Sequence, residues 1–220
     1  MKPDVGTALI VFAKAPENSK RRLADEIGCA DATHTATLLL YDALVRGRAA
    51  ALAPRYLYWD GSPTHSSLSD AVALGYATVP QVGGDLGERM ANAFAEVLDA
   101  NEQALLIGTD CPDLDADVLN RAAAALTAHD AVLVPACDGG YVLIGLSRRV
   151  LPHLRKLFDG IAWGGGDVTE VTRKRLGVCG LRFAELPSLE DLDRYADLDR
   201  LARRHPFLAA IGFRERKSAG

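Results

Sequence analysis

The chain has 220 residues, of which 49% are hydrophobic and 25% are charged, and its formal net charge is −4. This composition excludes an intrinsically disordered chain, and the length predicts a single domain over residues 1–220 with a sizeable core. The basic residues are dispersed along the sequence, which argues against a nucleic-acid partner. A small anionic substrate needs only a few local cations, so that class stays open.

Cysteine, histidine and N-terminal patterns exclude further classes of protein. The four cysteines (Cys29, Cys111, Cys137 and Cys179) lie far apart without a CxxC pair, which is typical of reduced, buried or half-buried thiols in a cytosolic protein. The five histidines form neither HExxH nor HxH, so a zinc site is not indicated. The N-terminal apolar run is too short for a signal peptide or a membrane span. We expect a soluble cytoplasmic protein.

The first half of the chain alternates short apolar runs with helical patterns. Residues 7–14 (TALIVFAK) are rich in β-branched side chains and predict a buried strand. Residues 31–52 carry a long helical repeat of leucine and alanine, and short strands are predicted at 55–61 and 76–81.

The next helix has the clearest periodicity. Its apolar side chains recur on one helical face, at Leu86, Met90, Ala93, Phe94, Val97 and Leu98. Asp85, with Glu88 three residues later, resembles a capping box and predicts the start of this helix.

The second half continues the alternation. The predicted elements are a strand at 103–110, a helix at 115–129, apolar runs at 131–137 and 141–146, a strand at 181–186 and a helix at 189–204. Strands that alternate with helices predict an α/β fold with a mostly parallel central sheet and helices on both faces. The pair over 131–146, joined by Asp138-Gly139-Gly140, is expected to form a small antiparallel hairpin.

Charged side chains gather after two of the predicted strands. Lys14 ends the first strand and a cationic loop follows with Lys20, Arg21 and Arg22, whereas the strand at 103–110 ends in Asp110. Ligands of open α/β sheets bind beyond the carboxyl ends of the strands. Cations suit phosphate oxygens, and a carboxylate is the oxygen ligand that Mg²⁺ or Mn²⁺ prefers. These residues predict a site for a phosphate-bearing substrate and a divalent metal.

Each of these features also has a simpler interpretation. The stretch Asp110–Asp113 could be a turn, and Asp113 is expected to cap the next helix. The cationic loop could be a solvated helix start, and Asp138–Gly140 could be only a hairpin turn. Asp191 and Asp193 could lie on a charged outer helix face. The joint placement of these residues at one edge of the sheet favours a site.

Several motifs resemble one known family. The runs LIVFAKAP, KRRL, GGDLGERM, LIGTDCPDL, DGGYVLIGL and LEDLDRYADLDRL follow one another in order along nearly the whole chain. They resemble a bacterial family related to the nucleotide-diphospho-sugar transferases, often labelled glycosyltransferase-A-like and carrying a domain of formerly unknown function. The resemblance implies a Rossmann-like GT-A fold that binds a nucleotide through a divalent metal, Mg²⁺ or Mn²⁺.

The resemblance also implies roles for individual residues. The Thr-Asp-Cys-Pro motif makes Asp110 a metal ligand, and Asp193, or alternatively Asp191, would complete the metal site. The Lys-x-Arg-Leu motif implies phosphate contacts for Lys20 and Arg22.

Further motifs are assigned to the base, sugar and acceptor. Gly83, Gly84, Asp85 and Arg89 would lie close to the base or sugar. The loop of Asp138, Gly139, Gly140 and Tyr141 would face the acceptor, with Asp138 as the best-placed general base.

Two stretches depart from the family pattern. The first loop is shortened to Glu17-Asn18-Ser19 and offers fewer backbone N–H groups to a phosphate, which disfavours a triphosphate. Glycines at 164–166 follow Trp163 where the family has Ser-Thr, and they are expected to loosen the loop and alter acceptor recognition or weaken activity.

Three functions follow from these patterns. The favoured one is a glycosyltransferase that moves a sugar from a nucleotide-diphospho-sugar to a small acceptor. The first alternative is a nucleotidyltransferase that uses a nucleoside triphosphate, and the second is a nucleotide-binding protein without turnover. The sequence leaves homodimer formation open.

Overall fold

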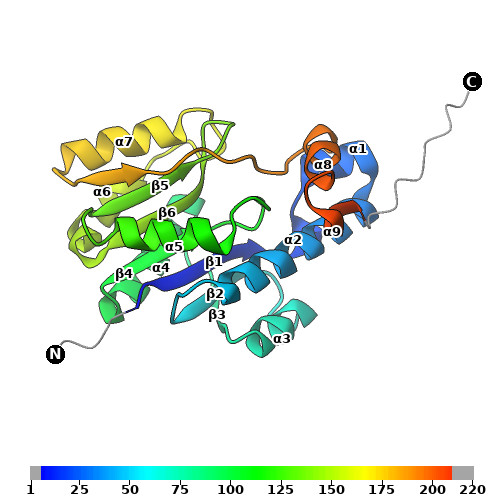
Figure 1. Cartoon of the computed structure of the whole chain (residues 1–220), viewed down its shortest axis with the longest axis horizontal. Helices are drawn as coiled ribbons and strands as arrows, with labels where there is room; N and C mark the ends of the chain where they lie inside the picture. The colour runs from blue at the N-terminus through cyan, green and yellow to red at the C-terminus, as the bar shows by residue number, and fades with distance from the viewer. Residues whose placement is uncertain (1–5, 210–220) are drawn as a thin grey trace, which may run out of the picture.

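Residues 6–209 are described by the computed structural model of the chain, and they form a seven-stranded sheet with helices on both faces (Figure 1). The strand order is β3-β2-β1-β4-β6-β5-β7. Every neighbouring pair is parallel except those of β6, which runs antiparallel to both β4 and β5. The predicted α/β fold, with its mostly parallel sheet and its small antiparallel part, is confirmed.

The strands lie close to the ranges that the apolar runs predict. They are β1 (Ala8–Lys14), β2 (Arg55–Asp60), β3 (Ala77–Pro80), β4 (Gln103–Ile107), β5 (Ala131–Pro135), β6 (Tyr141–Ser147) and β7 (Phe183–Glu185). The central strands β1, β4, β5 and β6 are almost entirely buried. Because helices cover both of their faces, these strands show continuous apolar runs instead of an alternating pattern.

The helices divide between the two faces of the sheet. They are α1 (Arg21–Ile27), α2 (Cys29–Ala49), α3 (Ser66–Ala73), α4 (Leu86–Ala100), α5 (Ala116–Ala125), α6 (Leu154–Phe158), α7 (Val168–Val178), α8 (Tyr195–Ala202) and α9 (Pro206–Ala209). Helices α2, α3 and α5 pack with Leu9 and Val11 of β1, whereas α4, α6 and α7 pack with Ala8 and Ile10. Within residues 6–209, no helix combines the length and the apolarity needed to cross a membrane.

A separate apolar cluster joins the two ends of the chain. Buried side chains from α1, α2, α8 and α9 meet in it, namely Leu23, Leu39, Leu198, Leu201 and Leu208. Figure 1 shows α1, α8 and α9 grouped together at one end of the molecule. This cluster holds the cationic loop at Lys20 close to the segment that precedes α8.

The prediction of one helix over 189–204 is wrong at its N-terminal part. Helix α8 begins only at Tyr195, and residues 189–193 are not helical. The Leu189 N–H donates to the carbonyl of Pro135 (3.0 Å), and the Leu192 N–H donates to the carbonyl of Asp110 (2.8 Å). These bonds to distant strands replace the hydrogen bonds that a helix would form within the segment.

The cysteines are only partly as expected. All four are free thiols, but Cys29 and Cys137 are exposed, so the expectation that all would be buried or half-buried is wrong for these two. Burial raises the pKa of the Cys111 thiol to about 12, so it is uncharged at neutral pH.

The predicted start of α4 is confirmed, with one difference. The Asp85 carboxylate accepts a hydrogen bond from the Glu88 N–H (2.8 Å), as an N-cap does. The Glu88 carboxylate accepts from the Gly84 N–H (2.8 Å), one residue before the position of a standard capping box. The two carboxylates therefore stabilise both the helix and the loop that leads into it.

Replacement of Asp85 by alanine is expected to lower the free energy of unfolding by about 1 kcal/mol, because the Glu88 N–H loses its acceptor. Urea denaturation measures the change. Asp99→Ala is the matched control, since it removes the same charge from the last turn of the same helix, where an acidic side chain opposes the helix dipole. Equal losses for the two variants would contradict the capping role.

Candidate functional site

A cavity of about 610 Å³ opens at the carboxyl ends of β1 and β4 and beside the start of β6. One part of its wall is apolar and includes Phe12, Leu40, Met90, Leu106, Val142 and Trp163. The other part is polar and includes Lys14, Lys20, Arg21, Thr109, Asp110 and Asp138. A cavity of this size with convergent charges at one end is the usual form of a small-molecule site.

Lys20 is the most constrained of the polar residues. Its backbone is left-handed (φ 54°, ψ 38°), and it is the one non-glycine residue of the described chain with a positive φ. The Lys20 side chain is 1% exposed, and its ammonium lies 2.9 Å from a carboxylate oxygen of Asp110. The same ammonium donates to the carbonyl of Leu192. Lys20 thus links the cationic loop to both β4 and the segment before α8.

A second groove is lined in part by that segment. It has a volume of about 280 Å³ and is lined by charged side chains that include Arg22, Asp138, Asp191, Asp193 and Arg200. Arg22 forms an ion pair with Asp193 (2.7 Å) in this groove. Asp138 borders both the cavity and the groove. Within the described chain, Arg21 lines the cavity and Arg22 does not, although the family motif selects Arg22.

Asp191 carries an electrostatic penalty in the folded protein. Its pKa is raised chiefly by burial and then by the negative charge of Asp138, with smaller contributions from Asp110 and Asp193. The structure therefore brings together all four carboxylates that the sequence places in the metal and acceptor sites. Their mutual repulsion favours a cation or an added proton in this region.

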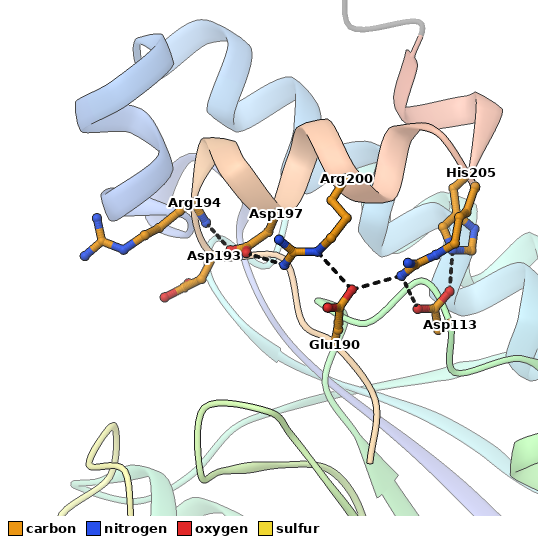
Figure 2. A network of polar contacts seen from close by, with 8 residues as sticks. Asp113, Glu190, Asp193, Arg194, Asp197, Arg200 and His205 are labelled. Carbon is orange, nitrogen blue, oxygen red and sulfur yellow. Dashed lines mark hydrogen bonds and ion pairs between the residues drawn. The ribbon is translucent and has the colours of Figure 1, made fainter. Parts of the chain in front are cut away.

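A network of ion pairs links the segment before α8 to α8 and to the turn that follows this helix (Figure 2). Glu190 contacts both Arg200 (3.2 Å) and Arg204 (3.0 Å), and hydrogen bonds from these arginines lower its pKa. Asp113 contacts Arg204 (2.8 Å) and His205 (2.7 Å). The expectation that Asp113 caps the next helix is wrong.

Asp115 is the residue that caps α5. It accepts a hydrogen bond from the Val118 N–H (2.9 Å). Asp113 is drawn away from the helix by two cationic partners that lie about 90 residues later in the sequence, so no local pattern could have identified its role.

The residues of the GGDLGERM run that were expected near the base or sugar have structural contacts in place of cavity contacts. Arg89 forms an ion pair with Asp60 (2.6 Å) at the end of β2 and donates to the carbonyl of Gly83 (3.0 Å). None of Gly83, Gly84, Asp85 and Arg89 lines the cavity within the described chain, whereas Leu86 and Met90 of the same run do. This run positions the apolar wall of the cavity.

The hairpin loop and the glycine loop pack directly against each other. Gly139 has a φ of +94°, and a Cβ built on it would lie 2.0 Å from the carbonyl oxygen of Gly166. The Thr169 N–H donates to the Gly139 carbonyl (2.9 Å), and the Gly140 N–H donates to the Asp138 carboxylate (2.9 Å). Gly139 therefore permits the close packing, whereas a Cβ on Gly164 would meet no atom within 4 Å and one on Gly166 would lie 3.5 Å from the carbonyl oxygen of Asp138.

Trp163 depends on a glycine of the GGDLGERM run. A Cβ on Gly87 would lie 2.7 Å from the Trp163 ring nitrogen and 2.5 Å from the carbonyl oxygen of Phe158. The absent side chain lets the indole lie on the first turn of α4, where it lines the cavity together with Tyr141.

The carboxylates do not form a metal site in the arrangement described. Within residues 6–209, no group of three or more His, Cys, Asp or Glu side chains is arranged to hold a metal ion. Both favoured ligands already have cationic partners, Asp110 with Lys20 and Asp193 with Arg22. The oxygen ligands suit Mg²⁺ or Mn²⁺ chemically, but as arranged they do not fit the ion.

Gly139→Ala is expected to destabilise the fold by clearly more than Gly160→Ala, as measured by denaturant unfolding. Both glycines have a positive φ, which costs an alanine about 1–2 kcal/mol, but only Gly139 would also place its Cβ against backbone. No atom lies within 4 Å of a Cβ on Gly160, so this variant isolates the conformational cost. Equal losses would mean that the two loops do not pack closely in solution.

Asp191→Asn is expected to raise the free energy of unfolding at pH 7. Because the folded-state pKa of Asp191 is raised, ionised Asp191 lowers the free energy of unfolding. This loss of stability is absent below the ordinary aspartate pKa and is fully present above the raised value. The gain should therefore shrink as the pH falls, in urea titrations at a series of pH values. Asp193→Asn is the control and should show no gain, because Asp193 loses its ion pair with Arg22. A gain that does not depend on pH would contradict this explanation.

Several solved structures resemble this chain, among them those of three proteins. A "putative nucleotide-diphospho-sugar transferase" from Desulfovibrio desulfuricans G20 is 30% identical with a TM-score of 0.81, and the match covers 90% of this chain and 87% of that one. Rv0371c from Mycobacterium tuberculosis H37Rv, solved in complex with manganese, is 18% identical with a TM-score of 0.55 and coverage of 90% and 98%.

The third is a CMP:2-keto-3-deoxy-manno-octonic acid synthetase solved with CTP. It is 14% identical with a TM-score of 0.58, and the match covers 90% of this chain and 98% of that one. At these lower identities the last two proteins share the fold alone with this chain. No curated protein matches the sequence significantly.

A family profile also matches residues 43–165, more than half of the chain. Together with the relative of 30% identity, this match shows that the chain belongs to the family described as "Uncharacterized protein conserved in bacteria (DUF2064)" and is related in structure to a protein described as a "putative nucleotide-diphospho-sugar transferase".

Proposed function

We propose that this protein is a glycosyltransferase that moves a sugar from a nucleotide-diphospho-sugar to a small acceptor. The observation that carries the proposal is the cavity, in which a cationic loop, a pair of carboxylates and an aromatic wall meet at the carboxyl edge of the sheet. The relative from Desulfovibrio desulfuricans, named for that class of substrate, supports the same reaction.

The cations of the cavity suit a diphosphate. Lys14 and Arg21 are exposed on the cavity wall, and neither has an ion-pair partner among residues 6–209. Both are therefore available to an anionic ligand, whereas Lys20 is engaged by Asp110. The apolar wall near Phe12, Met90 and Trp163 provides a surface for the base or the sugar.

Asp138 is the proposed general base. Its carboxylate borders the cavity, and the hydrogen bond from the Gly140 N–H fixes its orientation. In the proposed step, an acceptor hydroxyl oxygen forms a bond to the anomeric carbon of the sugar, and the bond from that carbon to the diphosphate breaks. The nucleoside diphosphate leaves with the bonding electrons, and the hydroxyl proton passes to Asp138.

Two considerations support a role for Mg²⁺ or Mn²⁺ in the proposed reaction, the charge of the leaving group and the metal found in a protein of the same fold. A divalent ion would neutralise charge on the leaving diphosphate. Rv0371c, which shares the fold, was solved with manganese. Asp110, with Asp193 or Asp191, supplies the carboxylates that this chain offers at the carboxyl edge of the sheet.

Nucleotidyl transfer is the second candidate, because fold relatives include the synthetase solved with CTP and a cytidylyltransferase from Leptospira borgpetersenii. The first loop argues against a triphosphate. The Asn18 N–H donates to the carbonyl of Ala15 (2.8 Å) and the Ser19 N–H to that of Pro16 (3.2 Å). These N–H groups are already used within the loop, so fewer are available to a third phosphate.

Nucleotide binding without turnover is the third candidate. Such a protein would bind a nucleotide but form no product under any condition, whereas a glycosyltransferase or a nucleotidyltransferase would form product.

Asp138→Asn is expected to retain donor binding and to lose about 10²–10⁴-fold in turnover, because the acceptor hydroxyl loses its base. Donors are identified with a thermal-shift panel of nucleotide-sugars and nucleoside triphosphates, with and without Mn²⁺ or Mg²⁺. A ligand at 100 times its Kd stabilises the fold by about 2.7 kcal/mol. Product is then measured with the donor found and a panel of small hydroxyl-bearing acceptors.

Three outcomes separate the candidates. Glycosyl transfer with Asp138 as base is supported if a nucleotide-sugar shifts the melting temperature of both proteins and product forms with the native protein alone. A shift and product with triphosphates alone favour nucleotidyl transfer. Binding without product in the native protein favours the third candidate. Asp99→Asn, a carboxylate change on the exposed surface of α4, is the control and should behave as the native protein.

A further inference from the structure

The residues that the sequence assigns to phosphate and those that it assigns to metal are paired with each other. Lys20 and Arg22 were expected to contact phosphate, and Asp110 and Asp193 to hold a metal. In the structure Lys20 lies 2.9 Å from Asp110, and Arg22 lies 2.7 Å from Asp193. The two ligand-binding sets therefore neutralise one another when neither ligand is bound.

The two pairs differ in strength. Arg22 and Asp193 are 60% and 40% exposed, so solvent screens their attraction and their pairing contributes little. The Lys20 side chain is 1% exposed, whereas that of Asp110 is 50% exposed. A buried ammonium needs a compensating charge, and Asp110 is the carboxylate that provides it. The open side of Asp110 faces the cavity.

The backbone around Lys20 is organised to keep this contact. Lys20 adopts the left-handed conformation that L side chains rarely take, and its carbonyl accepts the first hydrogen bond of α1 from Ala24 (2.8 Å). Its ammonium also donates to the Leu192 carbonyl, while the Leu192 N–H donates to the Asp110 carbonyl (2.8 Å). Three segments distant in sequence thus fix one ammonium against one carboxylate.

From this arrangement we infer that Lys20 is a built-in counter-ion that competes with divalent metal for Asp110. A metal ion that binds Asp110 alone must displace or repel the Lys20 ammonium. A phosphate oxygen at the cavity would draw the ammonium away and leave Asp110 free. Metal and diphosphate would then bind cooperatively and each weakly alone. The diphosphate half of this inference rests on the proposed function, and the metal half does not.

The surrounding charges agree with a competition at this point. Asp191 lies close enough to both Asp110 and Asp138 to interact with them electrostatically, and neither Asp138 nor Asp191 has a cationic partner in an ion pair among the described residues. The negative charges of Asp138 and Asp191 add to the attraction of Asp110 for a divalent ion. The barrier to its binding is the ammonium itself.

The test measures Mn²⁺ binding to the full chain without any nucleotide, from the EPR signal of free Mn²⁺. Lys20→Met is expected to bind Mn²⁺ at least about tenfold more tightly than the native protein, because a positive charge beside the ion is removed. Lys14→Met is the matched control. It removes a cation from the same cavity that does not pair with Asp110, so its affinity should change little.

Two further variants keep the result decisive. Lys20→Arg retains the charge and should bind Mn²⁺ as weakly as the native protein. Lys20→Gln removes the charge and retains a donor for the Leu192 carbonyl, so it replaces Lys20→Met should that variant not fold. Adding Asp110→Asn to either neutral variant should abolish the gain. No gain on neutralising Lys20, or a gain that survives Asp110→Asn, would overturn the inference.

A second titration uses inorganic pyrophosphate in metal-free buffer that contains a chelator. Here the neutral Lys20 variants are expected to bind about tenfold more weakly than the native protein, since a phosphate contact is lost. If Lys20 only supported the fold, its replacement would not raise the affinity for Mn²⁺ while lowering the affinity for pyrophosphate. If pyrophosphate does not bind the native protein, the diphosphate-based function fails while the Mn²⁺ result still decides the competition.

Discussion

The buried ammonium of Lys20 is the contact on which the arrangement of the site depends. It joins the loop after β1, the loop after β4 at Asp110 and the segment before α8 at Leu192, three parts of the chain that no local interaction could bring together. A cation removed from water in this way requires fixed acceptors, so the position of each segment constrains the other two. The ion-pair network of Glu190 and Asp113 links the last of these segments, through Arg204, to the loop after β4 (Figure 2).

Charge is distributed unevenly over the carboxyl edge of the sheet. Lys20 and Arg22 are neutralised by carboxylates, whereas Lys14 and Arg21 have no such partner within residues 6–209. The unpaired cations therefore provide the first attraction for an anionic ligand. Lys20 and Arg22 become available only when a ligand competes with their carboxylate partners. The charge that a second ligand meets at this edge therefore depends on whether the first ligand is bound.

Glycine supplies the close contacts of the opposite wall. Gly87 lets the Trp163 indole rest on α4, and Gly139 lets the hairpin loop pack on the carbonyl of Gly166. Asp138 directly precedes Gly139 in this loop and borders both the cavity and the second groove. Rigid support of this kind is what a proposed base needs, because proton transfer requires a fixed distance to the acceptor hydroxyl.

The sequence by itself determined the fold class, the strands, and the edge of the sheet where charged residues gather. Apolar runs, helical periodicity and the Asp85 cap are local signals, and β1, β4 and α4 lie close to the ranges that they predict. The tertiary structure alone decided the partners. The segment before α8 lost its predicted helix to hydrogen bonds with Pro135 and Asp110, and Asp113 left the α5 cap for Arg204 and His205. Pairing of Lys20 with Asp110 likewise needed strands far apart in sequence to end side by side, because an ion pair is set by distance in space and leaves no periodic trace along the chain.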